Sequence, residues 1–209
     1  SAGSWSVSAH ILSPLSKGLF KRAIMESGAQ FDSKERDVVN KTEAISQGKA
    51  MATQLKCNET ENWIQCLRRA DANDILKCET QFPINPLFET EFLPITAQQA
   101  FDQKKFNTDI DLLVGITHDE ASGCPTYLFA KRLAQTVKES QRVYFYELFY
   151  GSEYFGKQSG HYDSDWPQLL NDNPMGMPKV HGIDPTNLTL ILNDPFHQTC
   201  DGVWARYFL

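Results

Sequence analysis

The chain begins with Ser1-Ala2-Gly3, a triplet whose serine could act as a nucleophile. In the nucleophile-elbow motif G-x-S-x-G, a sharp turn between a strand and a helix exposes the serine hydroxyl group. Only the Ser-x-Gly half of that motif lies within the 209 residues. A serine of this kind reacts when a histidine takes its proton and a carboxylate orients the histidine. Three residues are too few to identify a function, so the meaning of the triplet depends on the rest of the chain.

The composition narrows the classes of protein to which the chain can belong. It is 41% hydrophobic and 22% charged, which is enough for one domain with a buried core. The net charge of −6 and the scattered basic residues argue against a nucleic-acid partner. No apolar run approaches the roughly 18 residues that span a bilayer, and no signal peptide is visible within the chain. The oligomeric state stays open.

The pattern of apolar residues predicts an α/β chain. A helix should follow the serine, and a short buried strand should follow that helix, which is the order found in parallel α/β sheets. The clearest strand is 109–117, whose near-continuous apolar run is typical of a central parallel strand. Residues 151–178 are rich in Gly, Asp, Asn and Pro and predict a loop. The other expected elements are helices over 4–12, from Thr42 through Leu55, from Thr60 through Leu67, from Thr96 through Phe101, over 125–140 and from Val203, and strands over 22–26 and 142–150.

The segment after the triplet carries a resemblance to a known family. The run from Ser1 to Ala29, which includes Ser1-Ala2-Gly3, Ile11-Leu12-Ser13-Pro14 and Glu26-Ser27-Gly28, closely resembles the segment after the catalytic serine of type-B carboxylesterases and cholinesterases. This resemblance implies an α/β-hydrolase fold, with a mostly parallel central sheet flanked by helices. It makes Ser1 the expected nucleophile and the chain a partial domain over residues 1–209, without the strands that precede the serine in that family.

The resemblance also indicates the acid of the triad. Gly115-Ile116-Thr117-His118-Asp119-Glu120-Ala121 is similar to the G-x-x-x-D-E-G segment of the family, which implies that Glu120 is the acid and Asp119 is structural. Ala121 departs from the glycine that is usual there. In that family a long helical stretch separates this segment from a C-P-T-x-x-F segment, whereas Cys124-Pro125-Thr126 follows almost at once here.

The base is expected to be His181. Met175-Gly176 and the later Val180-His181-Gly182-Ile183-Asp184 resemble the M-G-x-x-H-G-x-[ED] segment around the family's triad histidine, with two extra residues before the histidine. The order Ser1, Glu120, His181 is that of α/β-hydrolases. His197 and His161 remain the alternatives, while His10 and His118 match or adjoin positions that are not catalytic.

Two further residues receive roles by resemblance. The backbone N–H of Ala2 should donate one hydrogen bond to the oxyanion of the reaction. Ser27 matches a buried serine that supports the triad in the family, although a simple turn serine at the end of a strand is an equal alternative. The family's other oxyanion donors come from a Gly-rich turn before the serine, and this chain has no Gly-Gly pair. The reaction requires no metal and no cofactor, and its expected partner is a small-molecule ester.

The cysteines and glycosylation sequons favour a protein of the secretory pathway. Sequons begin at Asn40, Asn58 and Asn187. None of the five cysteines forms a C-x-x-C pair, which argues against a zinc site. Cys57 and Cys66 are close enough to close a small loop, and the resemblance implies that they form a disulfide rather than two free thiols. The resemblance pairs Cys124 with a cysteine near the C-terminus, for which Cys200 is the nearest candidate; the partner of Cys78 stays open.

Three functions remain open from the sequence. The first is a serine esterase that acts by acyl transfer through Ser1, His181 and Glu120, in a 209-residue chain expected to be inactive alone. The second is a non-catalytic cholinesterase-like adhesion or binding domain. The third takes Ser1 as an N-terminal nucleophile activated by its own α-amine, against which the helix directly after it argues. The protein is expected to be secreted or extracellular.

Overall fold

The chain forms a sheet that is parallel at its centre and has helices packed on one face. The computed structural model describes residues 2–31, 38–57, 62–78, 86–117 and 123–148, the backbone of 168–169, 179–183 and 191–193, and Phe196 and Cys200. The strand order is β1-β2-β3-β5-β6, and β4 also pairs with β3. The strands are β1 (Arg22–Glu26), β2 (Asp111–Thr117), β3 (Val143–Leu148), β4 (Gln168–Leu169), β5 (Lys179–Ile183) and β6 (Ile191–Asn193).

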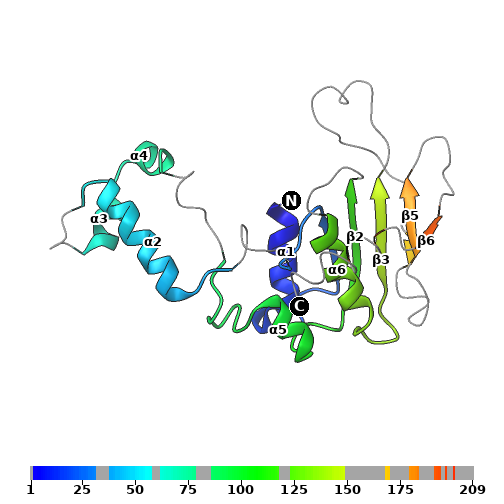
Figure 1. Cartoon of the computed structure of the whole chain (residues 1–209). Helices are drawn as coiled ribbons and strands as arrows, with labels where there is room; N and C mark the ends of the chain where they lie inside the picture. The colour runs from blue at the N-terminus through cyan, green and yellow to red at the C-terminus, as the bar shows by residue number, and fades with distance from the viewer. Residues whose placement is uncertain are drawn as a thin grey trace, which may run out of the picture.

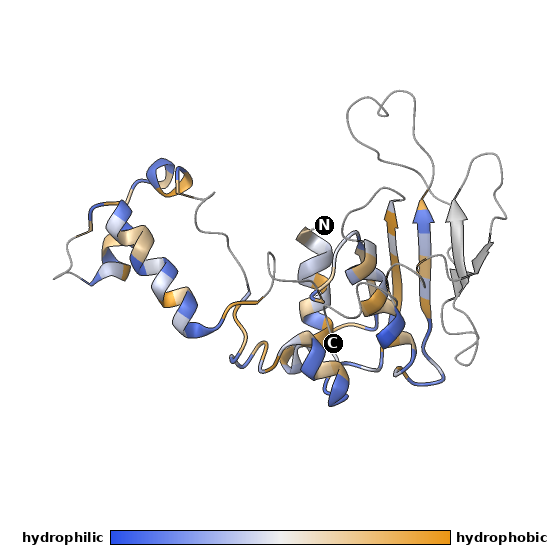
Figure 2. Cartoon of the chain, in the orientation of Figure 1, coloured by the Kyte–Doolittle hydropathy of each residue, from blue (hydrophilic) through white to orange (hydrophobic). Residues whose placement is uncertain are grey.

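The pairing directions divide the sheet into a parallel centre and an antiparallel margin. Strands β1, β2, β3 and β5 are parallel to one another, and Figure 1 shows β2, β3 and β5 side by side. Strand β6 is antiparallel to β5, and β4 is antiparallel to β3. Because β2 lies between β1 and β3, both of its edges are satisfied by backbone hydrogen bonds. Apolar residues make up most of β2, in orange in Figure 2, as expected for a strand inside a parallel sheet.

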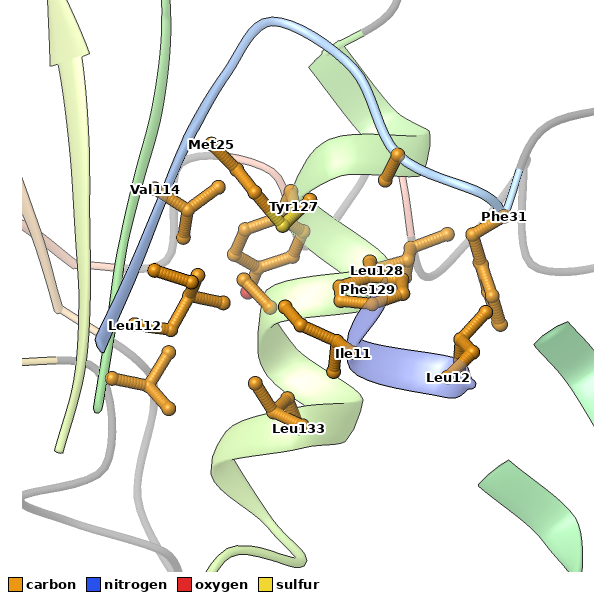
Figure 3. Packing of buried hydrophobic residues seen from close by; sticks show 14 of the residues in the cluster. Ile11, Leu12, Met25, Phe31, Leu112, Val114, Tyr127, Leu128, Phe129 and Leu133 are labelled. Atoms are coloured by element: carbon orange, nitrogen blue, oxygen red, sulfur yellow. The ribbon is translucent and has the colours of Figure 1, made fainter. Parts of the chain in front are cut away.

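The core lies between this sheet and two helices, α1 (Ala2–Leu12) and α6 (Gly123–Ala134). Alternate residues of each strand point towards the helices, so Met25, Val114 and Phe145 are fully buried. Figure 3 shows these strands and helices meeting through Ile11, Tyr127 and other apolar side chains. The opposite face of the sheet is more open, because Ile24 of β1 keeps 59% of its surface exposed.

Helix α1 runs antiparallel to the strands. Ser4 in its first turn donates a hydrogen bond from Oγ to the carbonyl of Gly28, just beyond the end of β1, over 2.5 Å. At its other end the carbonyl of Ile11 accepts a hydrogen bond from the backbone N–H of Asn107, before β2 begins. The N-terminus of α1 therefore lies at the carboxyl edge of the parallel strands.

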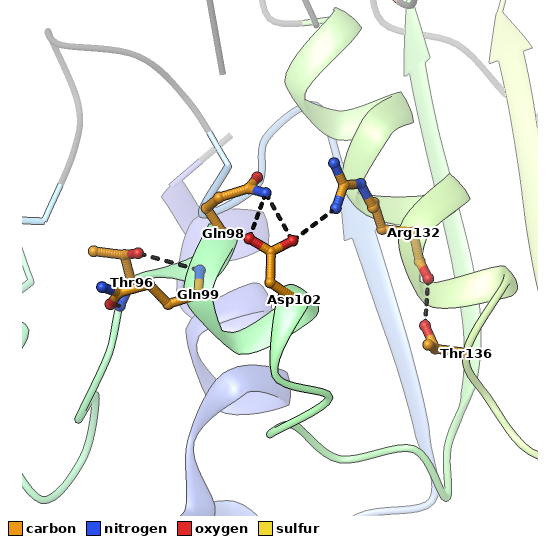
Figure 4. A network of polar contacts seen from close by, with 6 residues as sticks. All are labelled: Thr96, Gln98, Gln99, Asp102, Arg132 and Thr136. Atoms are coloured by element: carbon orange, nitrogen blue, oxygen red, sulfur yellow. Dashed lines mark hydrogen bonds and ion pairs between the residues drawn. The ribbon is translucent and has the colours of Figure 1, made fainter. Parts of the chain in front are cut away.

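A polar network joins α6 to the short helix α5 (Ala97–Asp102) at the side of the core (Figure 4). Asp102 accepts hydrogen bonds from Gln98 at 2.9 and 3.0 Å and from Arg132 at 3.2 Å. The Arg132 guanidinium group also lies 5.8 Å from the ring centre of Phe31. Thr96 begins α5 with a complete capping box, which confirms the cap expected from the sequence.

Three helices form a cluster to one side of the sheet (Figure 1). They are α2 (Lys41–Gln54), α3 (Trp63–Arg69) and α4 (Ala72–Leu76). Helices α2 and α3 approach each other closely at Gly48, which leaves room for the Trp63 ring. A Cβ atom at Gly48 would lie only 2.7 Å from that ring. The disulfide between Cys57 and Cys66, with a Cα–Cα distance of 5.9 Å, closes the connection between them.

The structure corrects several element boundaries. Helix α2 is capped by Asn40 and not by Thr42, because the Asn40 side chain accepts the Glu43 N–H at 2.8 Å. The cap of α3 is Asn62, while Thr60 lies outside the described residues. Strand β4 falls inside the stretch expected to be loop. The expected helix from Val203 lies outside the described residues.

Helix α6 begins two residues earlier and ends six residues earlier than the sequence predicts, at Gly123 and Ala134 instead of 125 and 140. Its C-terminal end follows from Thr136, whose hydroxyl group donates to the backbone carbonyls of Arg132 and Leu133. The backbone N–H of Thr136 also donates to Leu133, a tight turn that ends the regular helix.

We expect Ser8→Ala to lower the free energy of unfolding by about 1–3 kcal/mol. The fully buried Ser8 hydroxyl accepts the Gln30 N–H and donates to the Trp5 carbonyl, both at 2.7 Å, so the substitution leaves a buried N–H without its acceptor. Urea unfolding measures the loss. Ser6→Ala on the exposed side of the same helix is the matched control and should change stability by less than about 0.5 kcal/mol. Equal losses in the two variants would contradict the role of Ser8.

Candidate active site

Strands β1 and β2 end, and helix α1 begins, at the carboxyl edge of the parallel strands. Strand β1 ends at Glu26 and β2 ends at Thr117, and α1 begins with Ala2 at the same edge. Ligands of open α/β sheets bind beyond this edge. Ser1 and Glu120 lie outside the described residues, as do the neighbouring Asp119 and His118. Ala2 is exposed at the start of α1, where the first backbone N–H groups have no partner within the helix.

The structure places His181 within a strand. It is the third residue of β5, and its backbone is in parallel register with Tyr146 of β3. The two alternative histidines, His161 and His197, lie outside the described residues. The roles assigned to Ser1, Glu120 and His181 therefore remain predictions.

Ser27 forms a sharp turn directly after β1. Its φ of 55° lies in the left-handed region, which non-glycine residues adopt only when the surroundings hold them there. Its backbone N–H donates to the carbonyl of Gly115 over 3.0 Å, so the turn is tied to β2. The half-buried Ser27 thus has a defined place between two strand ends, while its support of a triad remains a prediction.

A contact across three strands lies close to this turn, and the sequence did not reveal it. Glu26, Gly115 and Tyr146 occupy one level of β1, β2 and β3. The Tyr146 ring lies against Gly115, and its hydroxyl group interacts with the Glu26 carboxylate. Burial, followed by the charge and hydrogen bonding of Glu26, raises the pKa of Tyr146 to about 12. The sequence signal was only the alternation of apolar and aromatic residues in Val143-Tyr144-Phe145-Tyr146.

The core face of β3 carries Glu147, a second acidic residue that the sequence did not single out. It keeps only 3% of its surface exposed and is the one buried acidic residue in the described part of the chain. Its backbone is in register with Gly182, the residue after His181. Because side chains alternate along a strand, Glu147 lies on the opposite face of β3 from Tyr146, the residue that is in register with His181.

A second disulfide closes the part of the chain that contains β3 and β5. Cys124, at the start of α6, is bonded to Cys200 with a Cα–Cα distance of 5.1 Å, which confirms the partner that the sequence indicated. Nearby, Phe196 packs on Tyr127 and Phe145 with ring centres 4.9 and 5.8 Å apart. Cys78 is a free thiol and is buried.

The described residues offer neither a metal site nor a membrane-spanning helix. No group of three or more His, Cys, Asp or Glu residues in this part of the chain is arranged to hold a metal ion. No helix in the same part is long and apolar enough to cross a membrane.

Comparison with known proteins identifies the family. The carboxylesterase family model matches residues 1–159. The chain is 33% identical to the acylcarnitine hydrolase of Rattus norvegicus over 144 residues, which are 68% of this chain and 25% of the relative. It is 36% identical to the pyrethroid hydrolase Ces2a of Mus musculus over 134 residues, or 61% of this chain and 23% of the relative. It is 34% identical to cholinesterase 2 of Branchiostoma lanceolatum over 132 residues, or 57% of this chain and 37% of the relative.

The chain belongs to the carboxylesterase family. The parallel sheet with α1 and α6 is accordingly part of an α/β-hydrolase fold, as the resemblance of the sequence implied. The chain spans about a quarter to a third of the length of the curated relatives described above.

We expect the Tyr146 hydroxyl group to ionise near pH 12 in the folded chain. Unfolded tyrosine ionises near pH 10, so the fold favours the neutral form. The stability that this group contributes should be complete below about pH 10 and be lost as the pH rises through about 12. Tyrosine labelled with ¹³C at Cζ reports the ionisation by NMR.

The variant Glu26→Gln should lower the pKa of Tyr146, because it removes the neighbouring negative charge. Tyr146→Phe should make the stability of the chain fall less steeply between pH 10 and 12. Tyr144→Phe, which removes a hydroxyl group from the same face of β3, controls for nonspecific effects. An ionisation of Tyr146 near pH 10 would contradict the environment described for it.

Proposed function

We propose that this chain supplies the nucleophile, acid and base of a serine esterase that hydrolyses a small carboxylic ester. The observation that carries the proposal is the position of α1, which begins directly after Ser1, at the carboxyl edge of the parallel strands. A serine that enters a helix at this edge has the place of a nucleophile elbow. The family match, which covers Ser1 and Glu120, supports the same assignment.

The proposed reaction is acyl transfer in two steps. The Ser1 hydroxyl oxygen forms a bond to the ester carbonyl carbon while His181 takes its proton, and Glu120 orients and stabilises the resulting imidazolium. The carbon–oxygen bond of the ester then breaks, and His181 returns the proton to the leaving alcohol. In the second step His181 removes a proton from water, which attacks the acyl-enzyme. The bond between the acyl carbon and the Ser1 oxygen then breaks, His181 returns the proton to Ser1, and the carboxylic acid leaves. The Ala2 N–H donates a hydrogen bond to the oxyanion in both steps.

We also propose that the 209 residues alone do not turn over substrate. They contain no Gly-Gly pair that could form the family's additional oxyanion donors. In the described part of the chain, β1 pairs only with β2, which leaves its other edge open. A decisive test of the site therefore needs a complete esterase domain around it.

A chimera tests the nucleophile and the acid of this site, whereas His181 lies outside the transferred residues 1–159. Residues 1–159 would replace the matching segment of mouse Ces2a, and hydrolysis of a p-nitrophenyl ester and labelling by a fluorophosphonate would be measured. We expect the chimera to turn over the ester and Ser1→Ala to lower kcat by about 10³-fold or more. Ser6→Ala is the control and should leave the rate unchanged. The 209-residue chain, assayed in parallel, should show neither turnover nor labelling that depends on Ser1.

Each alternative predicts a different result. A chimera that folds as well as Ces2a but is neither active nor labelled would favour the non-catalytic binding domain. Ser1 has no free α-amine in the chimera, so activity of the chimera would contradict an N-terminal nucleophile. Activity of the 209-residue chain alone that depends on Ser1 would favour an N-terminal nucleophile. A chimera that keeps its rate after Ser1→Ala would overturn the proposed nucleophile.

We propose in addition that the protein is secreted or extracellular and carries N-linked glycans at Asn40, Asn58 and Asn187. Two disulfides support an oxidising compartment. Asn40 caps α2 through Oδ1, which leaves its Nδ2 atom for a glycan. When the chain is expressed through a eukaryotic secretory pathway, peptide N-glycosidase F should lower its mass, and Asn40→Asp, which keeps the cap, should remove one glycan. An unchanged mass would contradict glycosylation.

A further inference from the structure

The close contact between Tyr146 and Gly115 links the strands that lead to the proposed site. A Cβ atom on Gly115 would lie 2.3 Å from both Cε1 and Cζ of the Tyr146 ring. A side chain at that position would have to displace the Tyr146 ring. The ring thus presses directly on the backbone of β2, two residues before that strand ends at Thr117.

The missing side chain of Gly115 also explains how Tyr146 reaches β1. Paired residues of adjacent parallel strands point to the same face, and two strand spacings separate β3 from β1 by about 10 Å. A side chain on the middle strand would block the way between them. With glycine at that level, the Tyr146 ring lies over β2 between β3 and Glu26, and the Glu26 carboxylate contributes to the raised pKa of Tyr146.

Glu26 is the residue before the turn that faces α1. Ser27, next in the chain, has the left-handed φ of 55° and donates its N–H to Gly115. Gly28 then accepts the hydrogen bond from Ser4 in the first turn of α1. Tyr146 therefore acts on Gly115, which accepts the Ser27 N–H, and on Glu26, which directly precedes Ser27. The turn itself holds the start of α1 through the hydrogen bond between Gly28 and Ser4.

We propose that Tyr146 is a positioning residue of the esterase site, whose ring fixes the end of β2 that leads to Glu120 and whose hydroxyl group fixes the turn at Ser27 through Glu26. The inference rests on the proposed function, since it assigns Tyr146 to the same site. Tyr146 is also in register with His181, so β5, the strand of the proposed base, lies next to the strand of Tyr146. Tyr146 acts through these neighbours and need not touch substrate.

The first experiment uses the 209-residue chain and needs no activity. We expect Tyr146→Phe to speed hydrogen exchange of the Ser27 amide about 10-fold, because Glu26 then loses its partner, while the Ile24 amide within β1 exchanges as before. Tyr144→Phe, on the same face of the same strand, should leave the Ser27 amide unchanged. Equal exchange of the Ser27 amide in Tyr146→Phe and the unchanged chain overturns the proposal.

The second experiment measures kinetics in the chimera with Ces2a, in which residues 1–159 supply all of β3. Tyr146→Phe should lower kcat about 10-fold with KM changed by less than 2-fold and with Tm nearly unchanged, whereas Tyr144→Phe should change none of these values. Glu26→Gln, which keeps an acceptor for the hydroxyl group, should retain most of kcat, and Glu26→Ala should match Tyr146→Phe. A lower Tm with an unchanged kcat would show a structural role only and would overturn the proposal.

The two experiments separate the two hypotheses. If the chimera with the unchanged segment folds but does not react, the proposed function fails and Tyr146 has no catalytic site to position. Hydrogen exchange of the Ser27 amide in Tyr146→Phe then still shows whether Tyr146 holds the turn. If the chimera is active and Tyr146→Phe alters neither exchange nor kcat, the positioning role fails and the proposed function stands.

Discussion

The parallel pairing of β2 with a strand on each side is the constraint on which the rest of the structure depends. Its register with β1 and β3 brings Glu26, Gly115 and Tyr146 to one level, although 120 residues separate the first from the last in sequence. The same pairing sends the ends of these strands to one edge. Leu112 and Val114 are fully buried against the helices, and burying a side chain of this size contributes roughly 1.5–3 kcal/mol.

Helix α1 connects the core to the proposed chemistry. Its apolar residues Ile11 and Leu12 pack into the core, while the buried hydroxyl groups of Ser4 and Ser8 bind the loop that follows β1. Both hydroxyl groups form hydrogen bonds with backbone groups, so they are buried without the free-energy cost of an unpaired polar group. The start of the helix is therefore held by directed bonds and not only by apolar contact.

Features that depend on neighbours along the chain could be predicted from the amino-acid sequence. The apolar run ending at Ile116 predicted a buried strand, Thr96 predicted the start of a helix, and the run after Ser1 indicated the family. Local signals were ambiguous where two residues could do the same task, as with Asn40 and Thr42 at the start of α2, because either side chain can accept the helix N–H. The placement of Ser1 and Glu120 stays a prediction.

Contacts between residues far apart in the chain follow from the pairing of the strands. The contact of Tyr146 with Gly115 and Glu26 follows from strand register, and a shift of one residue would turn Tyr146 to the other face. That contact leaves no local pattern in the sequence, because the environment of Tyr146 consists of residues contributed by other strands. The bond between Cys124 and Cys200, whose sequence separation is 76, was by contrast indicated by the family resemblance, and the structure confirms it.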